Sequence, residues 1–230
     1  MNYAVILAGV TGTRLGSDIP KQYIKVDGRM VIEYCLDTIL SHSMINAIQI
    51  VATDEWEVKI RAVVDGSSKL IGFSKPGANR QLSIYNALMD LKDIAMPDDC
   101  IIIHDAARPL LKAELITECL EKMNERDCDG VMPVLPMKDT VYLCEDGHSV
   151  SSLINRNQVF AGQAPEFFRY GKYMSANEAL FPDKIMQING STEPAVLAGM
   201  NIEMLPGDEG NFKITTSTDL ERFEEILSRR

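Results

Sequence analysis

The sequence has no long apolar run, no excess of positive charge and no metal-type cysteine spacing, and each absence excludes a class of protein. No segment approaches the ~20 consecutive apolar residues of a membrane-spanning helix. The N-terminus leads directly into a strand-like segment without a basic secretory region, so we expect a cytoplasmic protein with no membrane association. The net charge of -10 argues against a nucleic-acid partner, because an acidic surface repels a polyanion.

The cysteines also argue against a disulfide-stabilised or zinc-binding protein. The chain has five of them, at Cys35, Cys100, Cys119, Cys128 and Cys144. Their number is odd and none lies in a C-x-x-C or Cys/His pattern, so we interpret them as buried or incidental thiols. With 230 residues and 46% hydrophobic content the chain can form a sizeable core, and we predict a single domain spanning residues 1–230.

Strand-like and helix-like apolar patterns alternate along the chain. Strand-like runs occur at 4–7, 48–52, 70–73, 100–104, 130–134 and 202–205. Helix-like patterns occur at 31–40, 55–64, 82–91, 112–124, 167–180 and 217–227, the last with Ser217 as its expected cap. This alternation predicts an α/β protein with a Rossmann-like three-layer fold. Its sheet would be mostly parallel and twisted, and would bind ligands at the carboxyl ends of its strands.

Residues 135–155 interrupt the alternation. Asp146-Gly147 is a turn signal between two β-prone runs, which predicts a β-hairpin arm that projects from the sheet. A projecting hairpin is a natural dimerisation element.

The segment AVILAGVTGTRLGSDIPKQY joins an apolar strand to a glycine-rich, basic loop. Gly9, Gly12 and Gly16 let the backbone turn tightly and approach a ligand, while Arg14 and Lys21 add positive charge. Backbone N–H groups and cations together favour a polyphosphate. The spacing fits neither the dinucleotide fingerprint G-x-G-x-x-G nor the P-loop G-x-x-x-x-G-K-[ST]. A glycine-rich connection with two solvated cations is the alternative interpretation.

Asp105 ends the buried run IIIHD. A carboxylate in this position can bind Mg²⁺ together with triphosphate oxygens, which makes Asp105 the metal candidate. The alternative is that Asp105 caps the turn and pairs with Arg108. We interpret His104 as a hydrogen-bonded structural histidine rather than a base.

Six motifs follow one another in a characteristic order: LAGVTGTRLG with PKQY, KPGANRQLSIYNAL, IIIHDAARP, MPVLPMKDTVY, NRNQVFAGQAPEFF and NFKITTSTDL. In this order the chain resembles the 2-C-methyl-D-erythritol 4-phosphate cytidylyltransferases and the related ribitol 5-phosphate cytidylyltransferases over nearly its whole length. The resemblance implies Mg²⁺-dependent transfer of CMP from CTP to a small polyol phosphate, with release of pyrophosphate. It also implies a homodimer in which the arm crosses to the partner subunit.

The resemblance assigns roles to particular residues. Nucleotide binding would involve Leu7, Ala8, Gly9, Val10, Gly12, Gly77, Ala78, Arg80, Ser83 and Asp105, the last also beside Mg²⁺. The catalytic cations would be Arg14, Lys21, Arg156 and Lys213. The acceptor phosphate would be bound near Arg108, Thr140, Arg156 and Lys213. Thr140 and Arg156 would complete the site of the neighbouring subunit.

Two segments depart from the family pattern. Gln163-Ala164-Pro165-Glu166 replaces Q-T-P-Q, and Thr192-Glu193-Pro194-Ala195-Val196 replaces an acidic T-D-[DE]-A-S segment. These changes remove a hydroxyl and a carboxylate expected near the acceptor. The acceptor is therefore open between methylerythritol phosphate, ribitol phosphate and another sugar phosphate, and so is the pathway, isoprenoid synthesis or a cell-surface polymer. A nucleotide-binding protein without turnover is a second hypothesis. The missing G-x-G-x-x-G weakens a third, a nicotinamide-dependent oxidoreductase.

Overall fold

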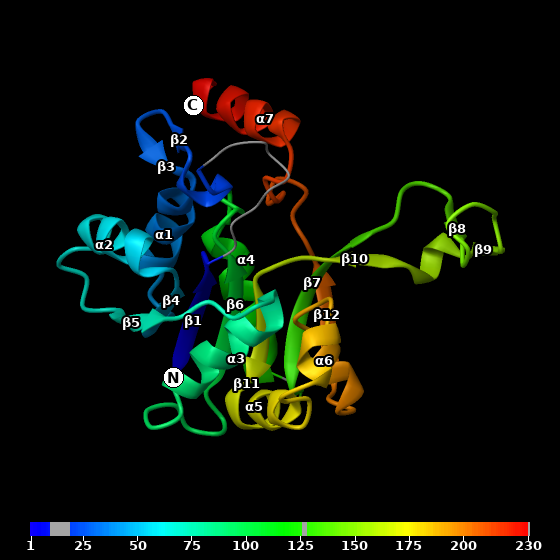
Figure 1. Ribbon diagram of the computed structural model, residues 1–230, viewed down its shortest axis with the longest axis horizontal. Coiled ribbons are helices and arrows are strands. Elements are labelled where there is room, and N and C mark those ends of the chain that lie inside the picture. The colour runs from blue at the N-terminus through cyan, green and yellow to red at the C-terminus, as the bar shows by residue number, and fades with distance from the viewer. Residues whose placement is uncertain (10–18, 126–127, 230) are drawn as a thin grey trace.

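A mixed eight-stranded sheet forms the centre of the molecule (Figure 1). The computed structural model describes residues 1–9, 19–125 and 128–229. Within them the strands of this sheet are β1 Asn2–Leu7, β4 Ala47–Val51, β5 Leu70–Ser74, β6 Cys100–Asp105, β7 Gly130–Pro136, β10 Phe160–Gly162, β11 Glu166–Arg169 and β12 Ile202–Pro206. Their order is β10-β7-β11-β6-β1-β4-β5, and β12 also pairs with β7.

The carboxyl ends of the three central strands are level with one another. β1 runs parallel to both β4 and β6, and Leu7 is in register with Val51 on one side and with Asp105 on the other. β5 continues the parallel arrangement, whereas β11 is antiparallel to β6 and β7. The loops that follow β1 and β6 therefore emerge side by side, as the predicted parallel sheet requires.

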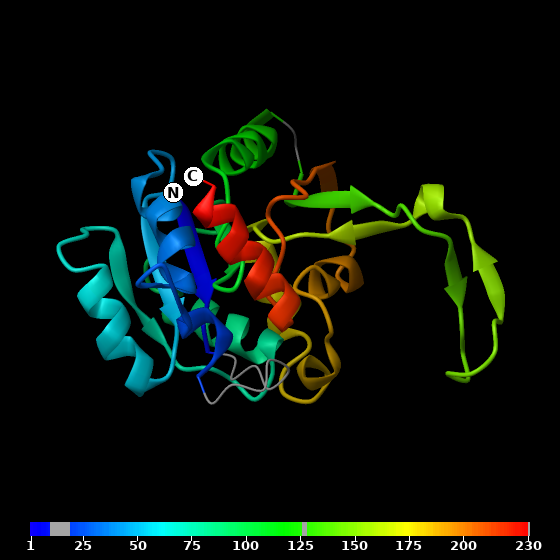
Figure 2. The ribbon, with the colours of Figure 1, turned by 90° about the horizontal axis from the view of Figure 1, so that it is seen from above.

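Helices cover both faces of the sheet (Figure 2). They are α1 Val31–Ser41, α2 Asp54–Val63, α3 Arg80–Asp90, α4 Ala113–Glu125, α5 Tyr170–Glu178, α6 Glu193–Leu197 and α7 Ser217–Ser228. Side chains of β1 alternate between two apolar clusters: Ile6 packs in the cluster that includes residues of α1 and α4, and Val5 in the cluster that includes residues of α3 and α5. The three layers of the predicted fold are confirmed.

The predicted hairpin projects from the body as an arm (Figure 1). It consists of β8 Val141–Leu143 paired antiparallel with β9 Ser152–Ile154, and Gly147 adopts a φ of 77° in the turn. Val150 and the opposing residues Tyr142 and Leu153 are exposed. The arm thus has little core of its own.

Shorter elements complete the described chain. A second hairpin pairs β2 Lys25–Val26 with β3 Arg29–Met30. Three short 3-10 helices are η2 Lys21–Tyr23, η3 Arg156–Gln158 and η4 Lys184–Gln187. All five cysteines are free thiols and only Cys144 is exposed, in agreement with the prediction. In the part of the chain that the structure describes, every helix is too short or too polar to cross a bilayer.

Two sequence predictions were wrong in detail. The segment 167–180, predicted as one helix, begins as strand β11, and helix α5 starts only at Tyr170. Phe167 and Phe168 are fully buried on opposite faces of the sheet, and so short an apolar run has no periodicity that separates strand from helix. The cap of α7 is Thr216 rather than Ser217: its hydroxyl accepts from the N–H of Asp219 at 3.3 Å.

Candidate functional site

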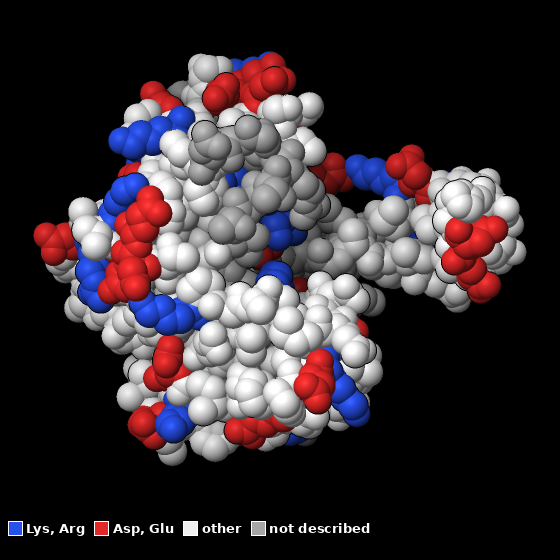
Figure 3. Space-filling view, viewed as in Figure 1, with Lys and Arg blue, Asp and Glu red and all other residues white. Residues whose placement is uncertain are grey.

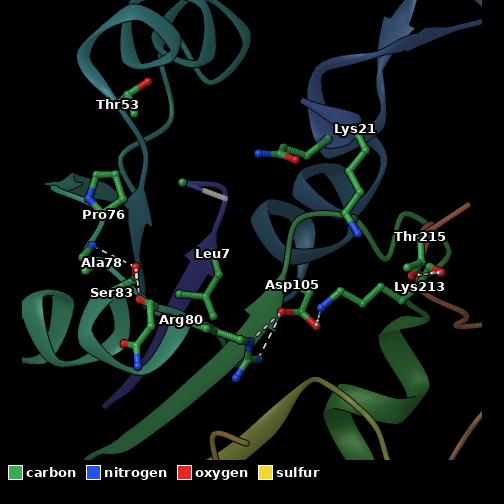
Figure 4. Close-up of a pocket in the computed structure, with 15 residues that line it drawn as sticks. Leu7, Lys21, Thr53, Pro76, Ala78, Arg80, Ser83, Asp105, Lys213 and Thr215 are labelled. Carbon is green, nitrogen blue, oxygen red and sulfur yellow. Dashed lines mark hydrogen bonds and ion pairs between the residues drawn. The ribbon is translucent and has the colours of Figure 1, made fainter. Parts of the chain in front are cut away.

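A pocket of about 510 Å³ lies at the carboxyl edge of the sheet, beside the ends of β1 and β6 (Figure 4). It brings together residues from separate segments, and nine of the residues expected from the sequence line it: Leu7, Gly9, Lys21, Gly77, Ala78, Arg80, Ser83, Asp105 and Lys213. Val10, Gly12 and Arg14, which were expected at the same site, lie outside the described residues. Figure 3 shows basic side chains inside a hollow on this face of an otherwise acidic protein.

Gly9 forms the pocket wall at the end of β1. A Cβ atom at this position would lie 2.5 Å from the Cβ of Pro76, so only glycine allows the two loops to approach this closely. Ala8 was also expected to contact the nucleotide, but it is buried beneath the wall. Its carbonyl accepts hydrogen bonds from the Gln22 amide at 2.6 Å and from the Tyr23 hydroxyl at 2.8 Å, which fixes the end of the strand.

The opposite wall is the start of α3. The Asn79 side chain caps the helix by accepting from the N–H of Leu82 at 2.7 Å. The Ser83 hydroxyl donates to the Asn79 carbonyl and accepts from the N–H of Gly77, both at 2.9 Å. Ser83 therefore ties the loop that carries Ala78 to the first helical turn, and the positive end of the helix dipole faces the pocket.

Asp105 is surrounded by three cations, Arg80, Arg108 and Lys213, and Figure 4 shows the contacts with Arg80 and Lys213. Its Oδ1 accepts from Arg80 Nε at 3.1 Å and Nη2 at 3.0 Å, and its Oδ2 accepts from Lys213 Nζ at 3.0 Å. Arg108 Nε lies 3.5 Å from Oδ2, so the ion pair expected under the alternative interpretation of Asp105 is present. Burial alone would raise the pKa of Asp105, but the three cations together hold it well below its usual range.

This arrangement decides how a metal could bind. No group of three His, Cys, Asp or Glu side chains suitable for a metal ion occurs among the described residues, and both oxygens of Asp105 already face cations. A divalent ion therefore fits only if phosphate oxygens and water supply most of its ligands, which is the usual situation for Mg²⁺ at triphosphates. His104 stays neutral because burial lowers its pKa to about 4, and its Nε2 lies 3.3 Å from the Arg108 carbonyl.

A smaller pocket of about 190 Å³ adjoins the first and shares Arg80, Asp105 and Lys213 with it. Arg108 and Glu166 also line it. The Glu166 side chain is almost entirely buried, and this burial raises its pKa to about 7. The negative charge of Asp105 raises the pKa further, whereas the positive charges of Arg80 and Arg108 partly offset the increase. In the sequence, Glu166 stands out only as a departure from the family pattern Q-T-P-Q, and this departure is the signal that marks it.

The second departing segment has an observable role. The Glu193 carboxylate accepts from the N–H groups of Asn189 at 2.7 Å and Gly190 at 3.3 Å, and Pro194 is buried in the first turn of α6. The carboxylate therefore closes the loop 189–193 instead of lining the small pocket.

Thr140 and Arg156 lie apart from both pockets. Both are exposed on the projecting arm, and the Arg156 guanidinium donates to the Lys138 carbonyl at 2.9 Å. The structure brings Lys21, Asp105, Arg108 and Lys213 together, but it does not bring the arm residues to the pockets of their own chain.

Comparison with known proteins places this geometry in a family. Residues 2–229 match the family model of 2-C-methyl-D-erythritol 4-phosphate cytidylyltransferase. The enzyme of that name from Thermotoga neapolitana is 33% identical to this chain, and the match covers 96% of this chain and 94% of that enzyme. The enzyme from Neorickettsia sennetsu is 30% identical, and the match covers 98% of this chain and 96% of that enzyme. A 4-diphosphocytidyl-2C-methyl-D-erythritol synthase crystal structure from Anaerococcus prevotii has the same fold, with a TM-score of 0.83, 23% identity and coverage of 99% and 98%. The chain thus belongs to the 2-C-methyl-D-erythritol 4-phosphate cytidylyltransferase family and is a nucleotidyltransferase.

Proposed function

We propose that the protein transfers CMP from CTP to 2-C-methyl-D-erythritol 4-phosphate, in isoprenoid synthesis. The observation that carries this proposal is the meeting of Lys21, Arg80 and Lys213 beside Asp105, at a strand end bounded by close-packed glycine loops. Such a site suits a nucleoside triphosphate. The acceptor is inferred from the names of the relatives.

The two adjoining pockets suggest how the substrates lie. Cytidine would bind between Gly9 and the start of α3, with the triphosphate directed towards Lys21 and Lys213, and the acceptor would occupy the small pocket beside Arg108. An oxygen of the acceptor phosphate attacks the α-phosphorus of CTP, the bond from that phosphorus to the bridging oxygen breaks, and pyrophosphate leaves. The reaction requires positioning and charge neutralisation and no nucleophilic side chain.

Mg²⁺ would enter with the triphosphate, whose charge it helps to neutralise. Asp105 would be the adjacent carboxylate, and its three cations would keep it ionised at any working pH. Arg14 would add a further positive charge from the glycine-rich loop. We also propose a cytoplasmic homodimer in which Thr140 and Arg156 reach the partner's acceptor pocket, since their own arm carries them away from the body (Figure 1).

The test is pyrophosphate release from CTP and Mg²⁺ with methylerythritol 4-phosphate, ribitol 5-phosphate and a panel of other polyol and sugar phosphates. We expect turnover with methylerythritol 4-phosphate, and a fall in kcat of about 10²–10³-fold in Lys213→Ala, because one charge-stabilising group is lost. The matched control is Lys92→Ala, an exposed lysine beyond the end of α3. Turnover with ribitol 5-phosphate alone would reassign the acceptor, and CTP binding without any turnover would indicate a non-catalytic nucleotide-binding protein.

A further inference from the structure

Three buried polar atoms in residues that line the small pocket have no hydrogen-bond partner among the described residues: Arg108 Nε, which faces Asp105 in an ion pair, and Glu166 Oε2 and Ser191 Oγ, which face no such partner. Glu166 is 9% exposed and Ser191 is 1% exposed. Buried polar atoms in folded proteins are almost always paired, so each unpaired one requires an explanation. Two of them in residues that line one small cavity indicate a ligand that supplies the missing partners.

The charges around this cavity restrict the ligand. Arg80, Arg108 and Lys213 contribute three positive charges, against two carboxyl groups, Asp105 and Glu166. The net positive wall would repel a cationic ligand such as an amine and would attract an anion that carries neutral hydroxyl groups. A hydroxyl can donate to a carboxylate and can accept from or donate to a serine. The cavity therefore suits the hydroxyl-bearing carbon chain of a polyol phosphate.

The other carboxylates near this cavity are already engaged. Asp105 directs both oxygens at cations, and Glu193 binds the backbone N–H groups of the loop 189–190. Ala164, also in the wall, has no polar side-chain atom. Of the two described carboxylates that line the small pocket, Asp105 and Glu166, the one with an oxygen open to a substrate hydroxyl is Glu166, at Oε2.

We propose that Glu166 determines which acceptor is used: its carboxylate accepts a hydrogen bond from one hydroxyl of the polyol phosphate, with the Ser191 hydroxyl as a second contact. The inference rests on the proposed cytidylyltransferase function. Glu166 stands where the family pattern has glutamine, and the inference gives it the role of recognising a hydroxyl group of the acceptor. This contact would compensate for the hydroxyl and the carboxylate that are missing at Ala164 and Pro194.

A purely structural role for Glu166 makes different predictions. The only hydrogen bond of its side chain among the described residues is a long one, 3.4 Å from Thr192 Oγ1 to Oε1. If this contact were the reason for a carboxyl group here, Thr192→Val would reproduce the effect of Glu166→Gln. If Glu166 binds the acceptor, Thr192→Val leaves acceptor binding much less affected.

The experiment measures the KM for CTP and the KM for the acceptor separately at pH 8. We expect Glu166→Gln to raise the acceptor KM about tenfold, the loss of one charge-assisted hydrogen bond, and to change the KM for CTP less than twofold. Ser191→Ala is expected to have a smaller effect of the same kind. The matched control is Glu178→Gln on the exposed end of α5. An acceptor KM within twofold of wild type in Glu166→Gln, or an equal rise in both KM values, overturns the proposal.

A second measurement identifies the hydroxyl. Acceptor analogues that each lack one hydroxyl are compared in wild type and in Glu166→Gln. One analogue is expected to bind wild type about tenfold more weakly and to lose nothing further in the variant, because without that hydroxyl the charge on residue 166 no longer contributes to binding. Equal additional loss for every analogue contradicts a direct contact.

Direct binding separates this inference from the proposed function. Calorimetric titration of polyol phosphates into enzyme saturated with a non-transferable CTP analogue does not depend on turnover. If wild type shows no turnover but binds a polyol phosphate in a Glu166-dependent manner, only the proposed function fails. If wild type turns over and Glu166→Gln binds the acceptor equally well, only this inference fails. Absence of any polyol-phosphate binding refutes both.

Discussion

At the scale of single residues, Asp105 organises the cations of the site before any substrate is present. Arg80 at the start of α3 and Lys213 near the end of the chain both contact its carboxylate, from opposite sides in Figure 4. Cations held in place in this way need little reorganisation when a triphosphate arrives, which is the condition for effective electrostatic stabilisation of a transition state.

Replacing Asp105 by asparagine should destabilise the fold. The variant leaves Arg80, Arg108 and Lys213 close together without their carboxylate, and we expect the free energy of unfolding to fall by about 3 kcal/mol at pH 7. Because the folded-state pKa of Asp105 is lowered, the wild-type advantage is present above the unfolded value near 4 and decreases as the pH falls below it. Urea unfolding at pH 7 and pH 3 measures this difference, with Asp65→Asn, in an exposed turn, as the control. Equal stability of Asp105→Asn and wild type at pH 7 would contradict the prediction.

Glu166 has the opposite pH dependence. Its folded-state pKa is raised from 4.5 to about 7, so the folded protein binds a proton that the unfolded chain releases, and the stability contributed by Glu166 is lost as the pH rises through this interval. Glu166→Gln should therefore match wild type near pH 4 and be more stable at pH 8, by about 3 kcal/mol. Thermal unfolding at the two pH values provides the measurement. A variant less stable than wild type at pH 8 would show that the carboxylate is compensated in the fold.

At the scale of elements, the arm cannot be stable through its own packing. A two-stranded hairpin is marginal in water, and β8 and β9 expose Tyr142 and Leu153 as opposing neighbours. The proposed dimer would cover both side chains and would hold Thr140 and Arg156 in place.

Leu153→Asp should therefore shift the protein from dimer to monomer in sedimentation velocity experiments, because a charge would be buried in an apolar contact. Activity should fall with it, since the arm residues would no longer reach a partner. Val58→Asp on α2 is the matched control, because Val58 is 71% exposed on the body of the protein. Unchanged sedimentation of Leu153→Asp would exclude the arm as the dimer contact.

Local sequence patterns predicted most helices and strands, and failed where tertiary packing determines the secondary structure of a short segment. Helices α1 to α4 and the parallel strands follow apolar periodicity, and Asp146-Gly147 marked the arm correctly. The four-residue strand β11 was mistaken for the start of a helix, since Phe167 and Phe168 are buried on both faces and carry no alternation. The two short elements β10 and α6 have no pattern long enough to detect.

At the scale of the whole molecule, helix α7 near the C-terminus packs against residues 26–34, which follow the glycine-rich loop in the sequence. Phe223 of α7 is fully buried with Val26, Val31 and Ile214, and its ring meets Tyr34 edge-on at 5.1 Å. This cluster anchors the stretch of chain that carries Lys213, so the position of a site residue depends on packing at the opposite end of the sequence.

Phe223→Ala should lower the free energy of unfolding by about 3–5 kcal/mol, as expected for the truncation of a buried phenylalanine. It should also raise the KM for CTP, because Lys213 loses its fixed position. Chemical unfolding and steady-state kinetics test the two parts separately, and Phe181→Ala, at a half-exposed ring, should have a smaller effect on both. A normal KM in a destabilised variant would mean that the segment is held independently of α7.

The site as a whole was only partly predictable from sequence. The rule that parallel strands place their carboxyl ends at one edge correctly predicted that the end of β1 at Leu7 would lie beside the end of β6 at Asp105. The three-way contact of Asp105 with Arg80, Arg108 and Lys213 was not predictable, because it depends on where α3 and the C-terminal segment pack. The burial of Glu166 beside this cluster depends on β11, the strand that local patterns missed.

The close approach of Gly9 to Pro76 has a consequence for the choice of nucleobase. At this contact one loop presents its backbone and the other a rigid proline ring, so the distance between the loops depends on the absence of a single carbon atom at Gly9. Gly9→Ala would push the loops apart by about one methyl group and widen the pocket that they line, so in the proposed binding mode a one-ring pyrimidine would lose contact with one wall while a two-ring purine gained room. Competition between ATP and CTP for this variant measures how far the preference for a pyrimidine nucleotide depends on the absence of a Cβ atom at residue 9.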